Sequence, residues 1–419
     1  MDRDGLALAS ASGRASGRVS RGPGRPWRHS RRDSGGGAWL RLVGRCAGAV
    51  FGVLVVAAAC ASPDSAQESG GWQAAVEQFG AEIAADVEHD GVGGITAALA
   101  RDGEVLWSGA YGWADPDGGV PAARETIYRT GSISKSFTAV LMAILADDGT
   151  VTLDTPLEDI VPEVRDLLDR PDGVNPTLRQ VASHTAGFGR EPGLPDAASG
   201  PIETWTSRIL ESIPTTRYQT PPGTEYSYSN IGFGILGFGL ERVAGEPFMD
   251  QVEARIFEPL GMTSSTFIVG EALLPALSVG HANGRDGQVN TQQPAMEHSG
   301  RGYKVPNGGV YSTVDDLAAF AAGVMGRGRP ALLSDEMRAE VLSVQTPEDP
   351  GSGYGLGFSV SAVDERVFAG HGGSVAGYTA YLLFEPATGY TVVLLRNYNQ
   401  GRTNLGRAAA ELLAGLSAI

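Results

Sequence analysis

Apolar residues recur at intervals of three and four in six stretches of this chain, which is the period of a helix with one buried face. The stretches predicted as helices are 75–89, 132–147, 231–243, 248–257, 312–322 and 404–416. The helix at 312–322 should open on a capping box, Ser312-Thr313-Val314-Asp315, in which a hydroxyl accepts a hydrogen bond from a free backbone N–H.

Shorter apolar runs bounded by turn residues predict strands near both ends of the chain. Two lie early, at 95–100 and 105–111, and are joined by a turn at 101–103; four lie late, at 355–361, 366–370, 377–384 and 390–396. Because strands come first and last, we expect an α/β protein of the α+β type. Its antiparallel sheet would be built from both chain ends and flanked by helices. The middle, about 150–300, should form an inserted, mostly helical lobe with the binding cleft beside it.

The first sixty residues differ in composition from the rest and predict an export signal. Residues 1–45 are basic and rich in Gly and Ser, as in a disordered leader, and 46–60 form an apolar run too short for a comfortable membrane span. We predict a flexible linker at 61–72 and one folded domain at 73–419.

Cys60 offers two interpretations of how this leader is cleaved. Ala57-Ala58-Ala59-Cys60 resembles a bacterial lipobox, in which the cysteine becomes lipidated, whereas Ala59-Cys60-Ala61 fits an ordinary signal-peptidase site. The linker that follows suits a tether and favours lipidation. The protein is therefore expected to be exported, as a lipoprotein on the outer face of the cell membrane or as a freely secreted protein. Its contact with the membrane would be limited to the lipid anchor or the signal peptide.

Charge and cysteine content exclude several classes of function. The formal net charge is −16, and residues 1–50 hold ten arginines against three aspartates, so the remainder carries −23. Such an acidic body argues against a nucleic-acid partner. The cysteines are Cys46 and Cys60, both in the leader region, so no disulfide is expected in the domain. No His-Glu-x-x-His motif or cysteine pair occurs in the domain, and we expect neither a metal site nor a cofactor.

Lysine is almost absent, since the chain contains thirty arginines but only Lys135 and Lys304. A lysine kept under that bias suggests chemistry that arginine cannot do, because a desolvated lysine can lose its proton and act as a base. Lys135 follows Ser132 by three residues, which places both on one face at the start of a predicted helix. A hydroxyl, an amine in reach of it and a helix N-terminus form an acyl-transfer site.

Two further segments extend this pattern. Tyr228-Ser229-Asn230 precedes the helix at 231–243, and His371-Gly372-Gly373-Ser374 joins two predicted strands. With Ser132-x-x-Lys135 they resemble, in order and separation, the motifs of the serine β-lactamase and penicillin-recognising D,D-peptidase superfamily, most closely its class C-like branch. Supporting matches lie at 183–188, 308–313, 354–358 and 370–378, and the resemblance covers roughly residues 75–415.

The resemblance implies a β-lactamase/transpeptidase-like fold and catalysis through an acyl-enzyme. Ser132 would be the acylated nucleophile, and Lys135 and Tyr228 would handle its proton, with either as the primary base. Asn230 would hydrogen-bond the substrate or orient Lys135. The backbone N–H groups of Ser132 and Ser374 would form the oxyanion hole.

The segment at 371–374 also bears on the substrate. Gly372 and Gly373 would let their strand approach the substrate without side-chain bulk. His371 departs from the lysine that class C β-lactamases carry there. As an imidazolium it could bind a carboxylate, but a pKa near 6.5 would make that binding partial at neutral pH. His184 is expected to be a buried organiser of its turn.

The leading hypothesis is an exported serine hydrolase acting on D-amino-acid peptides, esters or related amides, with weak β-lactam hydrolysis. Its partner would be a small-molecule or peptide substrate, with peptidoglycan as a candidate. The alternative is a penicillin-binding sensor or cell-wall-binding lipoprotein without turnover. An ionisable lysine beside the serine favours the enzyme, because a binder has no need of it.

Overall fold

The computed structural model describes residues 63–283, 288–328, 330–346, 351–363 and 365–416, which belong to one compact unit. The predicted leader, lipobox and Cys60 lie outside the described residues. Within the described ranges, no helix is both long enough and apolar enough to cross a bilayer.

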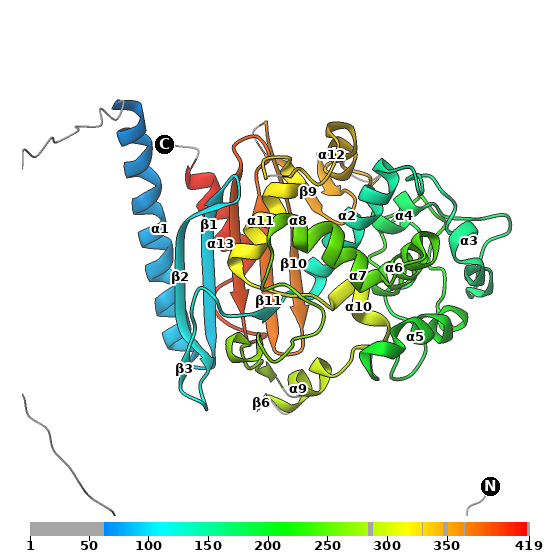
Figure 1. Ribbon diagram of the computed structural model, residues 1–419, viewed down its shortest axis with the longest axis horizontal. Coiled ribbons are helices and arrows are strands. Elements are labelled where there is room, and N and C mark those ends of the chain that lie inside the picture. The colour runs from blue at the N-terminus through cyan, green and yellow to red at the C-terminus, as the bar shows by residue number, and fades with distance from the viewer. Residues whose placement is uncertain (1–62, 284–287, 329, 347–350, 364, 417–419) are drawn as a thin grey trace, which may run out of the picture. The chain divides into compact units, whose positions relative to one another are not determined.

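An eight-stranded antiparallel sheet is assembled from both ends of the described chain, as expected (Figure 1). Its strand order is β3-β2-β1-β12-β11-β10-β9-β8, and β1 pairs with β12 so that Ile95 lies opposite Arg396. The strands are β1 Gly94–Arg101, β2 Glu104–Asp115, β3 Val120–Pro121, β8 Ser352–Tyr354, β9 Ser359–Val363, β10 Arg366–Val375, β11 Tyr378–Phe384 and β12 Tyr390–Arg396. The predicted turn between β1 and β2 is formed by Asp102 and Gly103, both with positive φ, the backbone that tight hairpins require.

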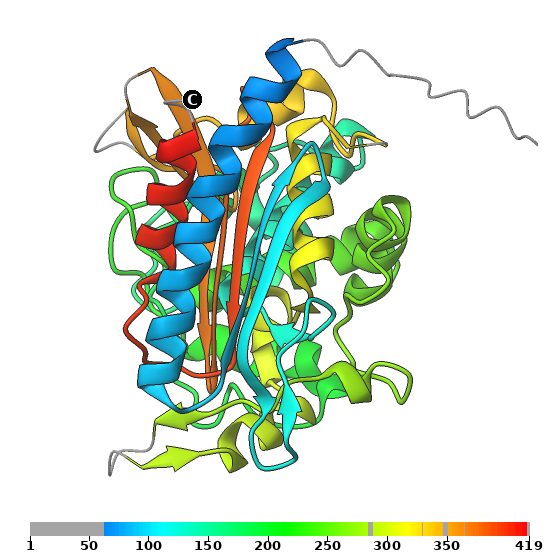
Figure 2. The same cartoon turned by 90° about the vertical axis from the view of Figure 1, so that its left-hand side faces the viewer.

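Helices cover both faces of this sheet. Helices α1 (Pro63–Asp90) and α13 (Leu405–Leu416) lie side by side over one face (Figure 2), where they bury apolar side chains against β1 and β12. Helices α2 (Ser134–Asp147) and α11 (Val314–Met325) belong to the larger core on the other face. Strand β1 is therefore buried along nearly its whole length, which explains its continuous apolar sequence.

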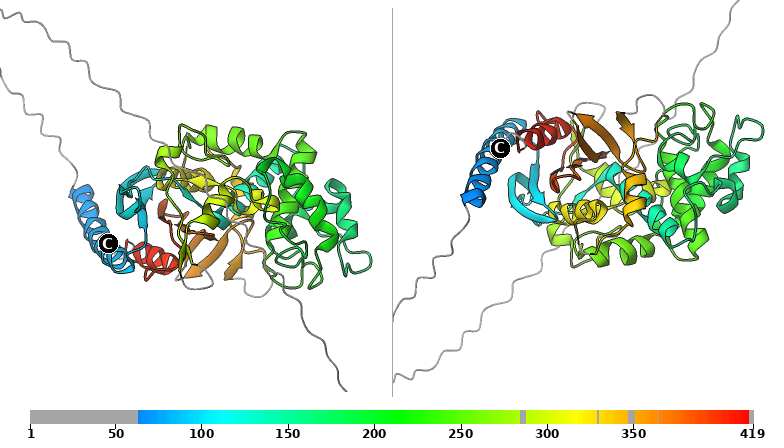
Figure 3. Two further views of the ribbon diagram at one scale, coloured as in Figure 1. Left: turned by 90° about the horizontal axis from the view of Figure 1, so that it is seen from below. Right: turned by 90° about the horizontal axis from the view of Figure 1, so that it is seen from above.

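Residues from about 157 to 252 form the expected helical region, which lies at the opposite end of the unit from α1 and α13 (Figure 3). Its helices include α6, whose residues 230–240 are all buried, so this helix is a central support of the region. The helices in the middle of the chain are α3 Leu157–Ile160, α4 Leu178–Ala182, α5 Trp205–Ser212, α6 Asn230–Ala244, α7 Phe248–Val252, α8 Glu258–Leu260, α9 Gln292–His298, α10 Val305–Gly308 and, nearer the sheet, α12 Asp335–Val341. Two-stranded pairs, β4 Tyr128–Arg129 with β7 Tyr311–Ser312 and β5 Ala282–Asn283 with β6 Val289–Asn290, complete the elements.

Two predicted boundaries at helix starts are wrong. Helix α1 begins at Pro63 and not at 75, so 63–72 is helical where a flexible linker was expected; proline is tolerated in the first turn of a helix. Helix α11 is capped by Thr313, whose hydroxyl accepts from the N–H of Asp316, because Ser312 is held in β7 opposite Tyr128.

Two strand predictions also need correction. The stretch 355–361 is interrupted because Gly357 adopts a positive φ and lies so close to α2 that a side chain would meet Ala139. The segment at 371–374, expected to join two strands, instead continues β10, where His371 pairs with Leu382 and Ser374 with Thr379 of β11. The ladder to β11 supplies the backbone hydrogen bonds that overcome the low strand propensity of glycine.

Candidate active site

Ser132 lies at the entrance to α2, a helix of which all residues from Ser134 to Ala143 are buried. A short 3-10 helix, Gly131–Ile133, leads directly into α2, and positive φ at Gly131 allows the turn. The turn is anchored from both sides, because Thr130 donates to the carbonyl of Val310 at 2.9 Å and Ser134 accepts from the N–H of the same residue at 3.0 Å. Ser132 is therefore held at a helix N-terminus by the hydrogen bonds of the residues that flank it.

Lys135 contacts Ser132 as the motif predicted. Its Nζ lies 3.1 Å from Ser132 Oγ and 3.2 Å from the backbone oxygen of Asn307, and its side chain is fully buried. The pKa of Lys135 is lowered well below its usual value, first by burial and then by the positive charge of Arg190. A neutral amine at hydrogen-bond distance from a hydroxyl can take its proton, which is what a general base requires.

Tyr228 completes the group around Ser132. The Lys135 Nζ is 4.8 Å from the centroid of the Tyr228 ring, and the Tyr228 hydroxyl hydrogen-bonds Ser132. Burial raises the pKa of Tyr228, while the bond to Ser132 acts in the opposite direction. The structure therefore brings together the three residues expected to carry the chemistry.

His184 positions Tyr228 and is buried, as expected. Its ring packs against that of Tyr228 with centroids 4.2 Å apart, and its Nδ1 accepts a hydrogen bond from the N–H of Ser229 at 3.0 Å. Burial lowers the pKa of His184 well below 6.5, so the ring stays neutral with its proton on Nε2.

Asn230 begins α6 and is tied to residues that the sequence analysis did not single out. Its amide donates to Glu191 at 2.6 Å, and Glu191 also accepts from the hydroxyl of Tyr303 and lies 3.8 Å from the Nζ of Lys304. Lys304 was visible as the second of only two lysines, whereas Glu191 carried no signal in the sequence. Both lysines of the chain thus lie at the site.

Strand β10 meets the nucleophile turn along an edge that β9 leaves open. The pairing of β9 with β10 stops at Gly370. Beyond it, a side chain at Gly373 would overlap the carbonyl oxygen of Thr130, and the backbone nitrogen of Ser374 lies beside Gly131. The backbone N–H groups of Ser132 and Ser374, expected to form the oxyanion hole, therefore belong to two segments in direct contact.

Gly373→Ala is expected to lower kcat about 100-fold. The added methyl group would push the turn that carries Ser132 away from β10 and misplace the nucleophile. Gly372→Ala is the matched control, since its side chain would meet only the ring of Tyr381, at 3.3 Å. Ester hydrolysis by both variants would be measured beside their melting temperatures. Equal activity of Gly373→Ala and Gly372→Ala would show that this contact does not hold the nucleophile.

His371 does not reach the cleft, so the expectation that it binds a substrate carboxylate is wrong. It is 5 % exposed; its Nδ1 donates to the carbonyl of Gly372 at 2.6 Å, and its Nε2 accepts from the Tyr354 hydroxyl at 2.8 Å. Burial, with the charge of Lys135, lowers the pKa of His371 to about 3. A neutral imidazole with both nitrogens occupied cannot hold an anion at neutral pH.

Buried His371 is instead expected to make stability depend on pH. An unfolded histidine takes up a proton below about pH 6.5, whereas the folded one does so only near 3. Its contribution is fully present above pH 6.5 and is lost as the pH falls towards 3. Between pH 7.5 and 5 the loss is about 2 kcal/mol. Urea unfolding of wild type and His371→Gln at both pH values should show a pH dependence smaller by about that amount in the variant; an equal dependence in both would refute the assignment.

The cleft around Ser132 has two branches. The larger, of about 760 Å³, is lined by Arg190, Tyr228, residues 372–374 of β10 and the segment 399–406. The smaller, of about 210 Å³, also contains Ser132 and Ser374 and is lined by Asn230, Lys304 and Asn307. An acyl group and a leaving group can therefore extend from Ser132 in different directions.

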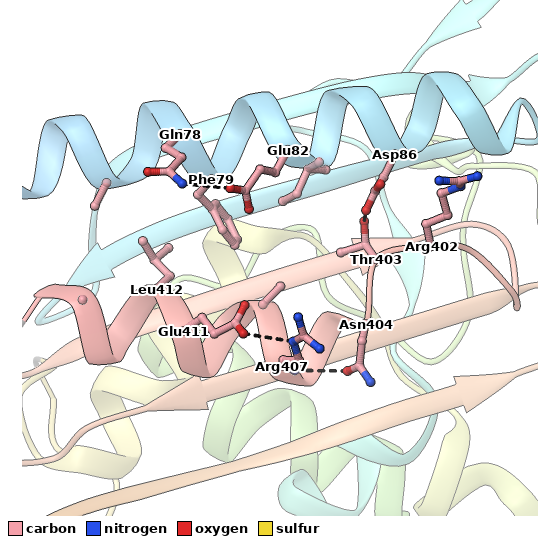
Figure 4. A pocket seen from close by; sticks show the side chains of 14 residues that line it. Gln78, Phe79, Glu82, Asp86, Arg402, Thr403, Asn404, Arg407, Glu411 and Leu412 are labelled. Atoms are coloured by element: carbon pink, nitrogen blue, oxygen red, sulfur yellow. Dashed lines mark hydrogen bonds and ion pairs between the residues drawn. The ribbon is translucent and has the colours of Figure 1, made fainter.

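A separate hollow of about 480 Å³ lies between α1 and α13 (Figure 4). Its polar side chains bind one another, as in the pair Arg407–Glu411 at 2.9 Å and the bond from Thr403 to Asp86 at 2.8 Å. None of Ser132, Lys135 and Tyr228 lines this hollow. In the part of the chain that the structure describes, no group of three His, Cys, Asp or Glu side chains could hold a metal ion.

Comparisons with known proteins agree with this geometry. Residues 73–416 match the protein family described as Beta-lactamase. Penicillin-binding protein 4 of Amycolatopsis lactamdurans is 28% identical over 337 residues, covering 78% of this chain and 87% of that protein. Esterase EstB of Burkholderia gladioli is 26% identical over 345 residues, covering 73% and 86%. A solved D-stereospecific amidohydrolase from Streptomyces sp. is 27% identical with a TM-score of 0.64, covering 81% and 97%.

Proposed function

This chain belongs to the β-lactamase family of serine hydrolases, and from that premise we propose that it hydrolyses D-amino-acid peptides, esters or related amides through an acyl-enzyme on Ser132. One observation carries the proposal: the buried Nζ of Lys135, with its lowered pKa, lies 3.1 Å from Ser132 Oγ. The proton of Ser132 passes to Lys135 or Tyr228 as Oγ bonds to the acyl carbon. The leaving group takes a proton as it departs, and water then releases the acyl group.

The open edge of β10 supports a substrate with an extended backbone. Among the described residues no strand pairs with β10 on the β9 side beyond Gly370, and residues 372–374 line the cleft beside Ser132. A free strand edge presents N–H and C=O groups that can pair with a peptide or amide. The named activities of the similar esterase and D-stereospecific amidohydrolase agree with an ester or amide substrate of this kind.

Weak hydrolysis of β-lactams is part of this proposal. Residues 372–374, by which β10 lines the cleft, are two glycines and a serine, and His371 is neutral and buried behind them. The strand thus lacks the cation that would hold a β-lactam carboxylate next to Ser132.

The alternative, a penicillin-binding sensor without turnover, differs from this proposal only in the fate of the acyl-enzyme. The similarity to a penicillin-binding protein agrees with this alternative. A buried lysine of low pKa remains available to activate water after acylation, which favours turnover.

The test is mass spectrometry of the intact purified domain during incubation with p-nitrophenyl esters, D-Ala-D-Ala peptides and β-lactams. We expect a transient mass increase equal to the acyl group and turnover of esters or peptides. A stable adduct with penicillin and no turnover of any substrate would establish the sensor. Absence of any adduct and any hydrolysis would refute the proposed function.

We further propose export, with Cys60 as the lipidated residue. Support comes only from the sequence of the leader and from a substrate class typical of the cell envelope. Detergent phase partitioning of the full-length protein and of Cys60→Ser tests this proposal. If the wild-type protein partitions into the aqueous phase, it is not lipidated and is freely secreted.

A further inference from the structure

Arg190 is an exposed cation that lines the larger branch together with residues 372–374 of β10. It follows His184 in the same stretch of the chain, residues 184–190. Its backbone oxygen accepts a hydrogen bond from the N–H of Asn230 at 2.8 Å. Its guanidinium carbon lies 4.8 Å from the centroid of the Tyr228 ring. The residue is thus tied by its backbone to the start of α6 and by its side chain to the phenol beside Ser132.

Within the described residues Arg190 forms no ion pair. The other two arginines of this branch have donors committed elsewhere: Arg396 donates to the backbone oxygens of Tyr398 and Thr403, and Arg402 bonds His89. No carboxylate occurs among the described side chains that line the branch. In a body with a net charge of −23, this part of the cleft is positive, and among its three arginines Arg190 is the one whose side chain makes no hydrogen bond to the described residues.

Among the described residues the side-chain N–H donors of Arg190 make no hydrogen bond, while its guanidinium carbon lies over the Tyr228 ring. The aromatic ring attracts the cation without using those donors, and the planar fork of a guanidinium matches the two oxygens of a carboxylate. The ring also restricts the side chain, so less rotamer entropy is lost when an anion binds. Arg190 is therefore arranged as an anion receptor before the substrate arrives.

We propose that Arg190 is a specificity-determining residue, which binds a carboxylate on the leaving-group part of the substrate through its planar N–H donors. This inference rests on the proposed hydrolase function and names the substrate class more closely. It moves anion recognition from β10, where His371 is buried, to Arg190, which lines the same branch of the cleft. A bidentate guanidinium–carboxylate pair supplies both the charge and the geometry.

The test compares two esters that give the same acetyl-enzyme, 3-carboxyphenyl acetate and 3-carbamoylphenyl acetate, whose leaving groups differ in charge. The ratio of their kcat/KM values is measured for wild type and for Arg190→Gln, Arg190→Lys, Arg402→Gln and Arg407→Gln. We expect the ratio of carboxylate to carbamoyl ester to fall about tenfold in Arg190→Gln, the effect of one charge-assisted contact near solvent. Arg190→Lys should be intermediate, because it keeps the charge and loses the fork. Arg407, an exposed arginine of α13, should leave the ratio as in wild type.

Several results would overturn the inference. One is an unchanged ratio in Arg190→Gln, and another is an equal fall in Arg407→Gln. A third is a fall in Arg402→Gln without a fall in Arg190→Gln. Whether hydrolysis of the two esters depends on Ser132 distinguishes a failure of this inference from a failure of the proposed function. If both esters are cleaved through Ser132 without a change in the ratio, only the role of Arg190 is lost. If neither ester needs Ser132, the hydrolase assignment itself fails.

Discussion

Replacing Ser132 by alanine is expected to abolish labelling by a fluorophosphonate or a fluorescent penicillin and to lower ester hydrolysis by at least about 10³-fold. Lys135 and Tyr228 both hydrogen-bond the Ser132 hydroxyl, so its removal leaves no nucleophile between them. Labelling is read on a gel, and hydrolysis is followed by release of p-nitrophenol.

Ser374→Ala is the matched control for this experiment. Ser374 lines both branches of the cleft, but the role proposed for it belongs to its backbone N–H, which alanine retains. The control should therefore still be labelled, and both variants should melt within a few degrees of wild type. Labelling of Ser132→Ala together with loss of labelling in Ser374→Ala would place the nucleophile on β10.

Replacing Lys135 by arginine is expected to lower kcat nearly as much as replacing it by alanine, by about 10³-fold or more. The site needs an amine that can lose its proton, and burial lowers the pKa of Lys135 well below its usual value. Arginine keeps its proton in proteins, so it would preserve the charge and lose the base. The measurement is the pH–rate profile of ester hydrolysis for both variants and wild type.

Lys304→Arg provides the comparison, because Lys304 is the other lysine of the chain and is partly exposed beside Glu191. There only the positive charge is used, so arginine should keep activity within about tenfold of wild type. If Lys135→Arg retains a tenth or more of the wild-type rate, Lys135 acts as a fixed charge and not as a base.

Local patterns placed most of the helices and strands and the nucleophile. The strand predicted at 390–396 coincides with β12, and the turn at 101–103 was placed correctly, because an apolar run and turn chemistry depend on neighbouring residues. Ser132 and Lys135 are one helical turn apart, so their contact follows from helix geometry alone. Tyr228 was placed at the site only by the resemblance of its motif, since 96 residues separate it from Ser132.

Such local patterns could not predict the environment of each side chain. His371 and the glycines after it look like a loop in the sequence, but pairing with β11 makes them strand and turns the imidazole towards Tyr354. Its burial lowers the pKa, and that burial is produced by residues far away in the chain.

The sequence by itself thus determined the sheet built from both ends, the helices around it and the pairing of Ser132 with Lys135, because these depend on periodicity and short-range geometry. Only the tertiary structure decided that His371 is withdrawn from the cleft, that Glu191 and Lys304 lie beside Asn230, and that Arg190 stacks on Tyr228. These features arise from long-range contacts that set burial and electrostatic potential, and neither quantity can be read from spacing along a chain.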